Sequence, residues 1–128
     1  MDANEERIKL LLSNYNILLL KSETITSEIE TLSEQYADFI GLPKMDVLLD
    51  DLRSYRDKAI MKAVRIETAI TSVEDEQARM LLEQRYLAGA TWEEIADSIG
   101  YSLSYVHRLH KKALRMISVD MLTADKVA

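Results

Sequence analysis

The sequence contains no cysteine and, among its 128 residues, only three glycines and one proline. Without cysteine it can form neither a disulfide framework nor a thiolate zinc site. So few glycines and prolines cannot supply the turns of a β-rich protein. What remains is rich in Leu, Ile, Ala, Glu, Lys and Arg, which favour helix. Because 48% of the residues are hydrophobic and 30% are charged, we predict a folded, soluble, all-α protein.

Long hydrophobic runs and a basic leader are also missing. The longest apolar runs, Leu10–Leu12 and Ile17–Leu20, are far too short to span a membrane. The N-terminus reads MDANEER, which is acidic where a signal peptide would be basic. No Gly-rich phosphate loop and no nucleophile motif is present. We therefore expect a cytoplasmic protein that is not an enzyme, needs no cofactor and has no membrane partner.

Charge is unevenly distributed along the chain. The net charge is -6, and residues 1–100 carry 20 acids against 11 bases. Residues 101–118, in contrast, carry four bases and no acid. His107 and His110 lie in this segment three residues apart, but no cysteine or carboxylate ligand accompanies them, so no metal site is expected. A basic segment in an acidic chain indicates a local contact with nucleic acid.

The first part of the chain has the pattern of a helical hairpin. Apolar residues recur every three or four positions from residue 8 to residue 39, as in a coiled-coil seam, with Ser22 as the only polar member. The sequence Gly41-Leu42-Pro43 should end this helix, and Asp46 is expected to cap a second one. A short link between two long amphipathic helices predicts an antiparallel coiled-coil hairpin. The stripes comprise Ile8, Leu11, Tyr15, Leu18, Ile25, Ile29, Leu32, Tyr36 and Phe39, then Leu48, Leu52, Tyr55, Ala59, Ile66, Ala69 and Val73.

The stretch WEEIADSIGYSLSYVHRLHKKAL, from Trp92 to Leu114, fits a helix-turn-helix. Such a motif needs a small residue where its two helices cross, and Ala96 supplies it. Four positions later, Gly100 tolerates the left-handed backbone of the turn. Thr91 with Glu94 forms a capping box for the first helix, and Ser102 can cap the second. The residues expected to lock both helices to the core are Ile95, Ile99, Val106 and Leu109, and Trp92 is expected to pack there too.

These patterns divide the chain into three predicted parts. Residues 1–74 form the coiled-coil hairpin, which serves assembly or partner binding. Residues 75–118 form the helix-turn-helix domain, in which Ser72 with Asp75 resembles a capping box at the start. Residues 119–128 form a flexible tail.

The second helix of the motif, residues 103–117, is predicted to enter the major groove of double-stranded DNA. Its candidates for base edges are Ser104, His107 and Arg108, because arginine can bind guanine through two hydrogen bonds. Those for phosphates are Lys111, Lys112 and Arg115. Ser102 is expected both to cap the helix and to touch phosphate, and Tyr105 belongs to the same outward surface.

The stretch LLEQRYLAGATWEEIADSIGYSLSYVHRLHKKALRMI resembles the promoter-reading C-terminal region of bacterial sigma factors. The shared pattern is an Arg-Tyr pair, a glycine and then W-x-x-I-A-x-x-x-G-x-S-x-x-x-V-x-R. It falls here on Arg85, Tyr86, Gly89, Trp92, Ile95, Ala96, Gly100, Ser102, Val106 and Arg108. With the long helices in front, the chain resembles small phage and prophage transcriptional regulators of the RinA and ArpU type. This resemblance implies transcriptional regulation of phage or mobile-element genes.

Three functions stay open at this point. The first is a sequence-specific transcriptional regulator whose hairpin pairs as a homodimer or higher oligomer, or contacts a protein such as RNA polymerase. The second is a phage small terminase subunit, which joins a helix-turn-helix to an oligomerising hairpin and assembles into rings. The third is a coiled-coil adaptor in which the helix-turn-helix binds no DNA.

Overall fold

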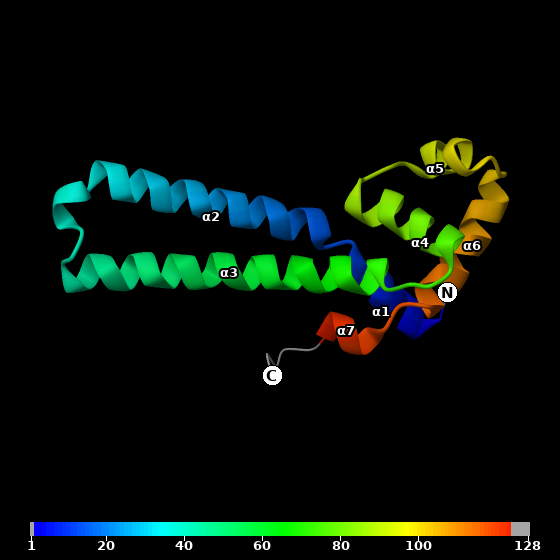
Figure 1. The fold of residues 1–128 in the computed structure, drawn as a ribbon, viewed down its shortest axis with the longest axis horizontal. Helices are drawn as coiled ribbons and strands as arrows, with labels where there is room; N and C mark the ends of the chain where they lie inside the picture. The colour runs from blue at the N-terminus through cyan, green and yellow to red at the C-terminus, as the bar shows by residue number, and fades with distance from the viewer. Residues whose placement is uncertain (1, 124–128) are drawn as a thin grey trace.

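A computed structural model describes residues 2–123, and every regular element in that range is helical. The fold is therefore all-α, as predicted. The helices run in the order α1 (Ala3–Leu12), α2 (Tyr15–Gln35), η1 (Ala37–Phe39), α3 (Pro43–Thr71), α4 (Glu76–Leu82), η2 (Glu83–Leu87), α5 (Trp92–Ile99), α6 (Leu103–Arg115) and α7 (Val119–Thr123). Figure 1 shows a long arm made of α2 and α3, joined at one end to a body that holds the other helices.

The first helix is not continuous, contrary to the prediction. It breaks at Ser13 and Asn14, between α1 and α2. The Ser13 hydroxyl donates to the Lys9 carbonyl at 2.7 Å, a local bond that competes with the helical ladder. Asn14 starts α2 as its N-terminal cap position. The break turns α1 away from the arm, so that Ile8 and Leu12 are buried in the body.

The arm is an antiparallel pair with a narrow core. Ile25, Ile29 and Leu49 form its buried cluster, and farther along α3 the small residues Ala59 and Ala63 are also buried. The predicted stripe of α3 is wrong at two positions, because Leu48 and Tyr55 are exposed. An α-helix turns by 3.6 residues rather than 3.5, so a stripe drawn on a coiled-coil repeat drifts onto neighbouring positions.

The turn at the free end of the arm is ordered by specific backbone and side-chain contacts. After the short helix η1, Gly41 takes a positive φ of 96°, where glycine is favoured. Its N–H donates to the Asp46 carboxylate at 3.0 Å. Helix α3 then begins at Pro43, with Leu42 as its N-cap. Asp46 therefore stabilises the turn instead of capping α3 as expected.

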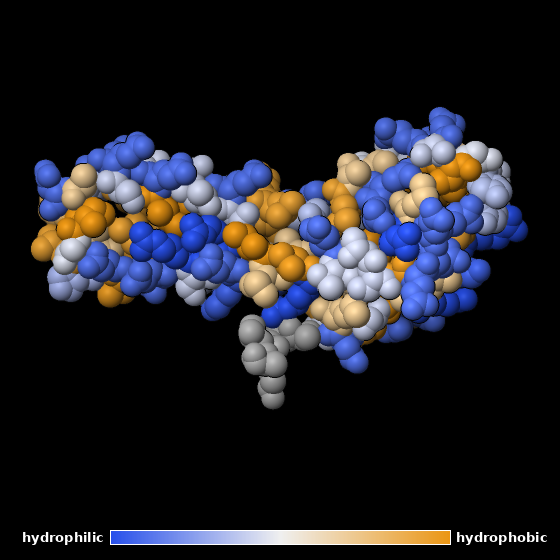
Figure 2. Space-filling model, in the orientation of Figure 1, coloured by the Kyte–Doolittle hydropathy of each residue, from blue (hydrophilic) through white to orange (hydrophobic). Residues whose placement is uncertain are grey.

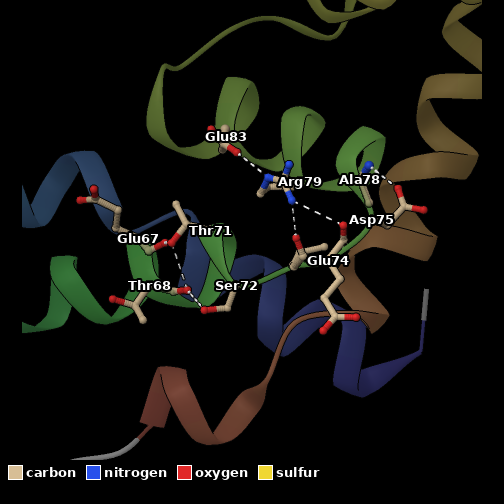
Figure 3. Close-up of polar contacts among 10 residues, drawn as sticks. Glu67, Thr68, Thr71, Ser72, Glu74, Asp75, Ala78, Arg79 and Glu83 are labelled. Atoms are coloured by element: carbon tan, nitrogen blue, oxygen red, sulfur yellow. Dashed lines mark hydrogen bonds and ion pairs between the residues drawn. The ribbon is translucent and has the colours of Figure 1, made fainter.

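The link from the arm to the body also differs from the prediction. Figure 3 shows that Ser72 belongs to the end of α3, where its hydroxyl donates to the Thr68 carbonyl at 2.6 Å. Asp75 alone caps α4, accepting the Ala78 N–H at 2.8 Å. The guanidinium of Arg79 reaches back to two carbonyls of the linker, at 2.9 and 3.5 Å. Four short-range hydrogen bonds thus order the link between α3 and α4.

The body has one continuous apolar core, to which the two ends of the hairpin segment also contribute. Helix α1 and the last turns of α3 bury side chains together with α4, α5 and α6. Dividing the chain at residue 74 remains a prediction, but this core extends across that position. Its members are Ile8, Leu12, Ile66, Ala69, Ile70, Val73, Ala78, Leu81, Leu82, Tyr86, Ile95, Ala96, Val106, Leu109, Ala113, Leu114 and Ile117.

The chain does not leave the fold at Ser118. Val119 and Leu122 of α7 pack against the body core, and α7 lies along α3. The prediction of a flexible tail is therefore wrong for residues 119–123, because two of their apolar side chains pack against the body core. Its remainder, residues 124–128, lies outside the described residues.

Candidate nucleic-acid interface

The turn between α5 and α6 has the geometry that its sequence predicts. The Thr91 hydroxyl accepts the Glu94 N–H at 3.1 Å, and the Glu94 carboxylate accepts the Thr91 N–H at 3.0 Å. These two bonds complete the capping box, and they lower the pKa of Glu94. Gly100 ends α5 in the left-handed conformation, with φ of 75°. A rigid α5 and a sharp turn therefore place the start of α6.

Buried side chains lock α6 at its angle. Ile95 and Ala96 of α5 meet Val106 and Leu109 of α6 in the core, and Ile99 packs against their edge. The four larger side chains were predicted from their spacing to lock the helices to the core, and Ala96 was predicted as the small residue where the helices cross. With one face of α6 held in this way, its opposite face is left for solvent or a ligand.

Trp92 connects α5 to α6 through tilted ring contacts. Its indole lies 4.6 Å from the ring of His110 and 5.2 Å from that of His107, measured between centroids. The Arg85 guanidinium lies over the indole at 4.3 Å and donates to the Ala90 carbonyl at 3.1 Å. The packing expected for Trp92 is thus present, and it positions His107 on the outer side of α6.

His110 is buried, which its place in the basic segment did not indicate. Its Nε2 lies 2.6 Å from the Tyr86 hydroxyl. Burial, reinforced by the positive charges of Lys9 and Arg85, lowers the pKa of His110 to about 4. Burial also raises the pKa of Tyr86 to about 12. Both side chains are therefore neutral at pH 7. His110 packs in the core of the body and does not belong to the outward basic face of α6.

The outward face of α6 presents the basic side chains. Ser104, His107, Arg108, Lys111 and Lys112 are all exposed. Arg108, Lys111 and Lys112 supply three of the four bases of residues 101–118, and no acid lies in that segment. The structure therefore places five of the eight predicted contact residues on one continuous solvent-facing surface.

Comparison with known proteins bears on this arrangement. Residues 75–118 match the family described as Sigma-70, region 4. These residues form a sigma-70 region 4-like helix-turn-helix. Over 97 residues the chain is also 32% identical to the RNA polymerase sigma factor SigO of Bacillus subtilis, a match that covers 76% of this chain and 48% of that protein. Over 78 residues it is 31% identical to the RNA polymerase sigma-F factor of the same organism, covering 61% of this chain and 30% of that protein.

The chain thus spans half or less of the length of the curated relatives it matches. No solved structure matches it significantly. The resemblance to sigma factors that the sequence suggested is confirmed for the region 4-like domain.

Two of the remaining predicted contact residues lie at the start of α6 in the region 4-like domain. Ser102 caps the helix by accepting the Tyr105 N–H at 3.1 Å. The Tyr105 hydroxyl donates to the side-chain oxygen of Gln77 at 2.8 Å, and its ring stacks on Tyr101 at 4.4 Å. Tyr105 is therefore half-buried against α4, and only part of it faces outward. The spacing of α6 gave no signal of Gln77, which is 28 residues away.

The last predicted contact residue, Arg115, joins the region 4-like domain to α1. Its Nε donates to Glu5 at 2.5 Å. The Glu5 side chain is only 2% exposed, whereas that of Arg115 is 66% exposed. The bond to Glu5 raises the pKa of Arg115. Glu5 was not predicted, because 110 residues separate the partners; its place in the Asp2 capping box was the only local signal.

Two further features, a metal-binding cluster and a membrane-spanning helix, are absent from the described residues. Within residues 2–123, no group of three or more His, Asp or Glu side chains is arranged to hold a metal ion. No helix in that range has the length and apolar character to cross a membrane.

Proposed function

We propose that the chain is a sequence-specific DNA-binding regulator of transcription. One observation carries this proposal: within the region 4-like domain, the face of α6 turned away from the core is basic and free of acids. Phosphate groups along a duplex attract such a face. The rest of the chain is acidic, so like charge keeps the arm away from DNA and confines binding to this end.

In the proposed complex, the N-terminal half of α6 lies in the major groove. Ser104, His107 and Arg108 then face the base edges, where Arg108 can bind guanine through two hydrogen bonds. Lys111 and Lys112 lie farther along the same side and meet phosphates. Ser102, Tyr105 and Arg115 belong to the rim of this surface, where each already makes a contact within the protein.

The genes under control are proposed to be those of a phage or prophage. The sequence joins a region 4-like domain to a helical hairpin, and this combination resembles the small phage regulators described above. The two relatives are named RNA polymerase sigma factors, which supports RNA polymerase as a partner of this chain as well.

A second copy is proposed to pair through the arm. Exposed apolar side chains gather on the half of the arm nearer the body (Figure 2). Pairing would bury these side chains. A dimer would also carry two copies of α6, which could bind two half-sites on the DNA. The side chains concerned are Ile17, Leu20, Ile60, Met61 and Val64.

The test is binding of the full chain to duplex fragments of its source genome, measured by fluorescence anisotropy at several salt concentrations. Arg108→Ala should weaken binding to the best fragment about 10–100-fold and relax its specificity. Lys111→Ala should weaken binding to all fragments and lower the salt slope by about 1. Lys44→Ala removes a base at the far end of the arm and serves as the matched control.

If both α6 variants bind as the unaltered chain does, the assigned surface is wrong. If the unaltered chain binds no duplex at all, the adaptor function replaces this proposal. Light scattering, which measures the oligomeric state, distinguishes the regulator from a terminase subunit. A large ring would indicate a terminase subunit, and a dimer would indicate the regulator.

A further inference from the structure

The free end of the arm exposes a cluster of large apolar side chains. Within residues 36–48, six of them are each 43–60% exposed. Figure 2 shows apolar surface at this end of the molecule, next to hydrophilic surface. We call this cluster the tip patch; it consists of Tyr36, Phe39, Ile40, Leu42, Val47 and Leu48. In other proteins, exposed apolar patches of this kind mark the surfaces that bind partners.

The tip patch is held in a defined shape. The rings of Tyr36 and Phe39 meet edge to face, with 6.1 Å between their centroids. The Gly41 N–H bonds to the Asp46 carboxylate at 3.0 Å, and Pro43 starts α3 directly afterwards. A surface ordered in advance loses little conformational entropy when it binds a partner.

Acidic residues lie among and on both sides of the tip patch in the sequence. Residues 34–51 contain five acids and one base, Lys44, for a net charge of -4. All five acids are exposed. Asp50 pairs with Arg53 at 3.2 Å, so the charge stays negative even when that arginine is counted. The five are Glu34, Asp38, Asp46, Asp50 and Asp51.

The negative charge near the tip patch indicates which kind of partner can bind there. Two tips brought together would place -4 against -4, and like charges oppose such a contact. An apolar surface bordered by lysine and arginine would complement both the apolar centre and the acidic rim. Figure 1 also shows the tip at the far end of the arm from α6, so a partner held there does not compete with DNA.

We propose that the tip patch is a docking surface for RNA polymerase core enzyme, on an apolar, basic-rimmed area of that enzyme. This inference rests on the proposed function. The sequence likeness to the sigma factor SigO supports it, because that likeness covers 97 residues of this chain. Residues 75–128 supply at most 54 of them, so at least 43 lie in residues 1–74. The arm therefore shares in the likeness to a polymerase-associated protein.

The test measures binding of the full chain to purified Bacillus subtilis RNA polymerase core by biolayer interferometry. Phe39→Ser with Leu42→Ser should weaken binding at least about 10-fold, as expected when central apolar contacts are lost. Leu10→Ser with Met121→Ser removes two exposed apolar side chains from the body and should leave binding unchanged. Asp38→Lys with Asp51→Lys should also weaken binding and make it less dependent on salt.

Each variant is also measured for helix content by circular dichroism and for DNA binding, both of which should match the unaltered chain. If the tip variants bind core as tightly as the unaltered chain does, or if the unaltered chain does not bind core, the proposal is overturned. It is also overturned if the tip variants abolish self-association in sedimentation, because the occupant is then a second copy. Loss of DNA binding by the unaltered chain would instead refute the proposed function.

Discussion

The body and the arm bury their apolar residues to different extents. Eight large apolar side chains of the body are 0–1% exposed. The three core residues of the arm retain 3–9% exposure, and they are Leu49, Ile29 and Ile25. The body encloses its core with helices from several directions, whereas two helices side by side share one seam and leave their outer faces in water. Stability should therefore reside mainly in the body, whereas most exposed large apolar side chains lie on the arm.

The largest predicted difference in the free energy of unfolding comes from truncating one buried isoleucine to alanine in each region. Ile70→Ala in the body should lower the free energy of unfolding toward the upper end of the range of about 2–5 kcal/mol, because enclosing neighbours cannot collapse into the cavity. Ile25→Ala in the arm should cost about 2 kcal/mol or less. Urea unfolding of both variants provides the measurement. Equal losses would show that the arm is as tightly packed as the body.

Acid should weaken the body through His110. Its pKa is about 4 in the folded chain and 6.5 when unfolded, so the unfolded state takes up a proton first as pH falls. The stability contribution is complete above pH 6.5 and is lost progressively down to about pH 4, amounting to about 2–3 kcal/mol. His110→Leu should remove this part of the pH dependence in urea unfolding between pH 7.5 and 4.5. An unchanged slope would assign the effect to other groups.

Ion pairs should also differ between the two regions. Arg115→Ala leaves the buried carboxylate of Glu5 without its arginine and should lower the melting temperature. Arg53→Ala removes an exposed pair on the arm and should cost less than about 0.5 kcal/mol. Combining Arg115→Ala with Glu5→Leu should recover part of the loss, since no buried charge then remains. Thermal unfolding measures all three, and identical melting temperatures for the two single variants would contradict the expectation.

The two turn glycines, one in each region, should show a purely local effect. Gly100 and Gly41 have φ of 75° and 96°, and a Cβ at either position would meet no atom within 4 Å. The cost of alanine there is therefore backbone strain alone, about 1–2 kcal/mol. Gly100→Asn should cost less than Gly100→Ala, because asparagine tolerates the left-handed region. Equal costs, measured by thermal unfolding, would indicate that the turn rearranges.

The sequence predicted best what depends on near neighbours. The capping box of Thr91 and Glu94, the turn at Gly100 and the buried side of α6 are all set by residues within a few positions of one another. Contacts between distant segments were missed, such as Glu5 with Arg115 and Tyr86 with His110. Spacing within one helix says which residues share a face, but not which segment covers it. For this reason the burial of His110 was not foreseen. The break at Ser13 is local, but the apolar spacing continues across it and therefore did not indicate it.

The break at Ser13 and Asn14 also determines how the arm is mounted. Because α1 and the end of α3 both enter the body core, the arm is clamped at two roots and projects in a fixed direction from α6. If α6 sits in the groove as proposed, the tip points to one side of the double helix. Moving the binding site by about half a helical turn, roughly 5 base pairs, would carry the tip to the opposite side. Regulation would then depend on rotational phase as well as on distance.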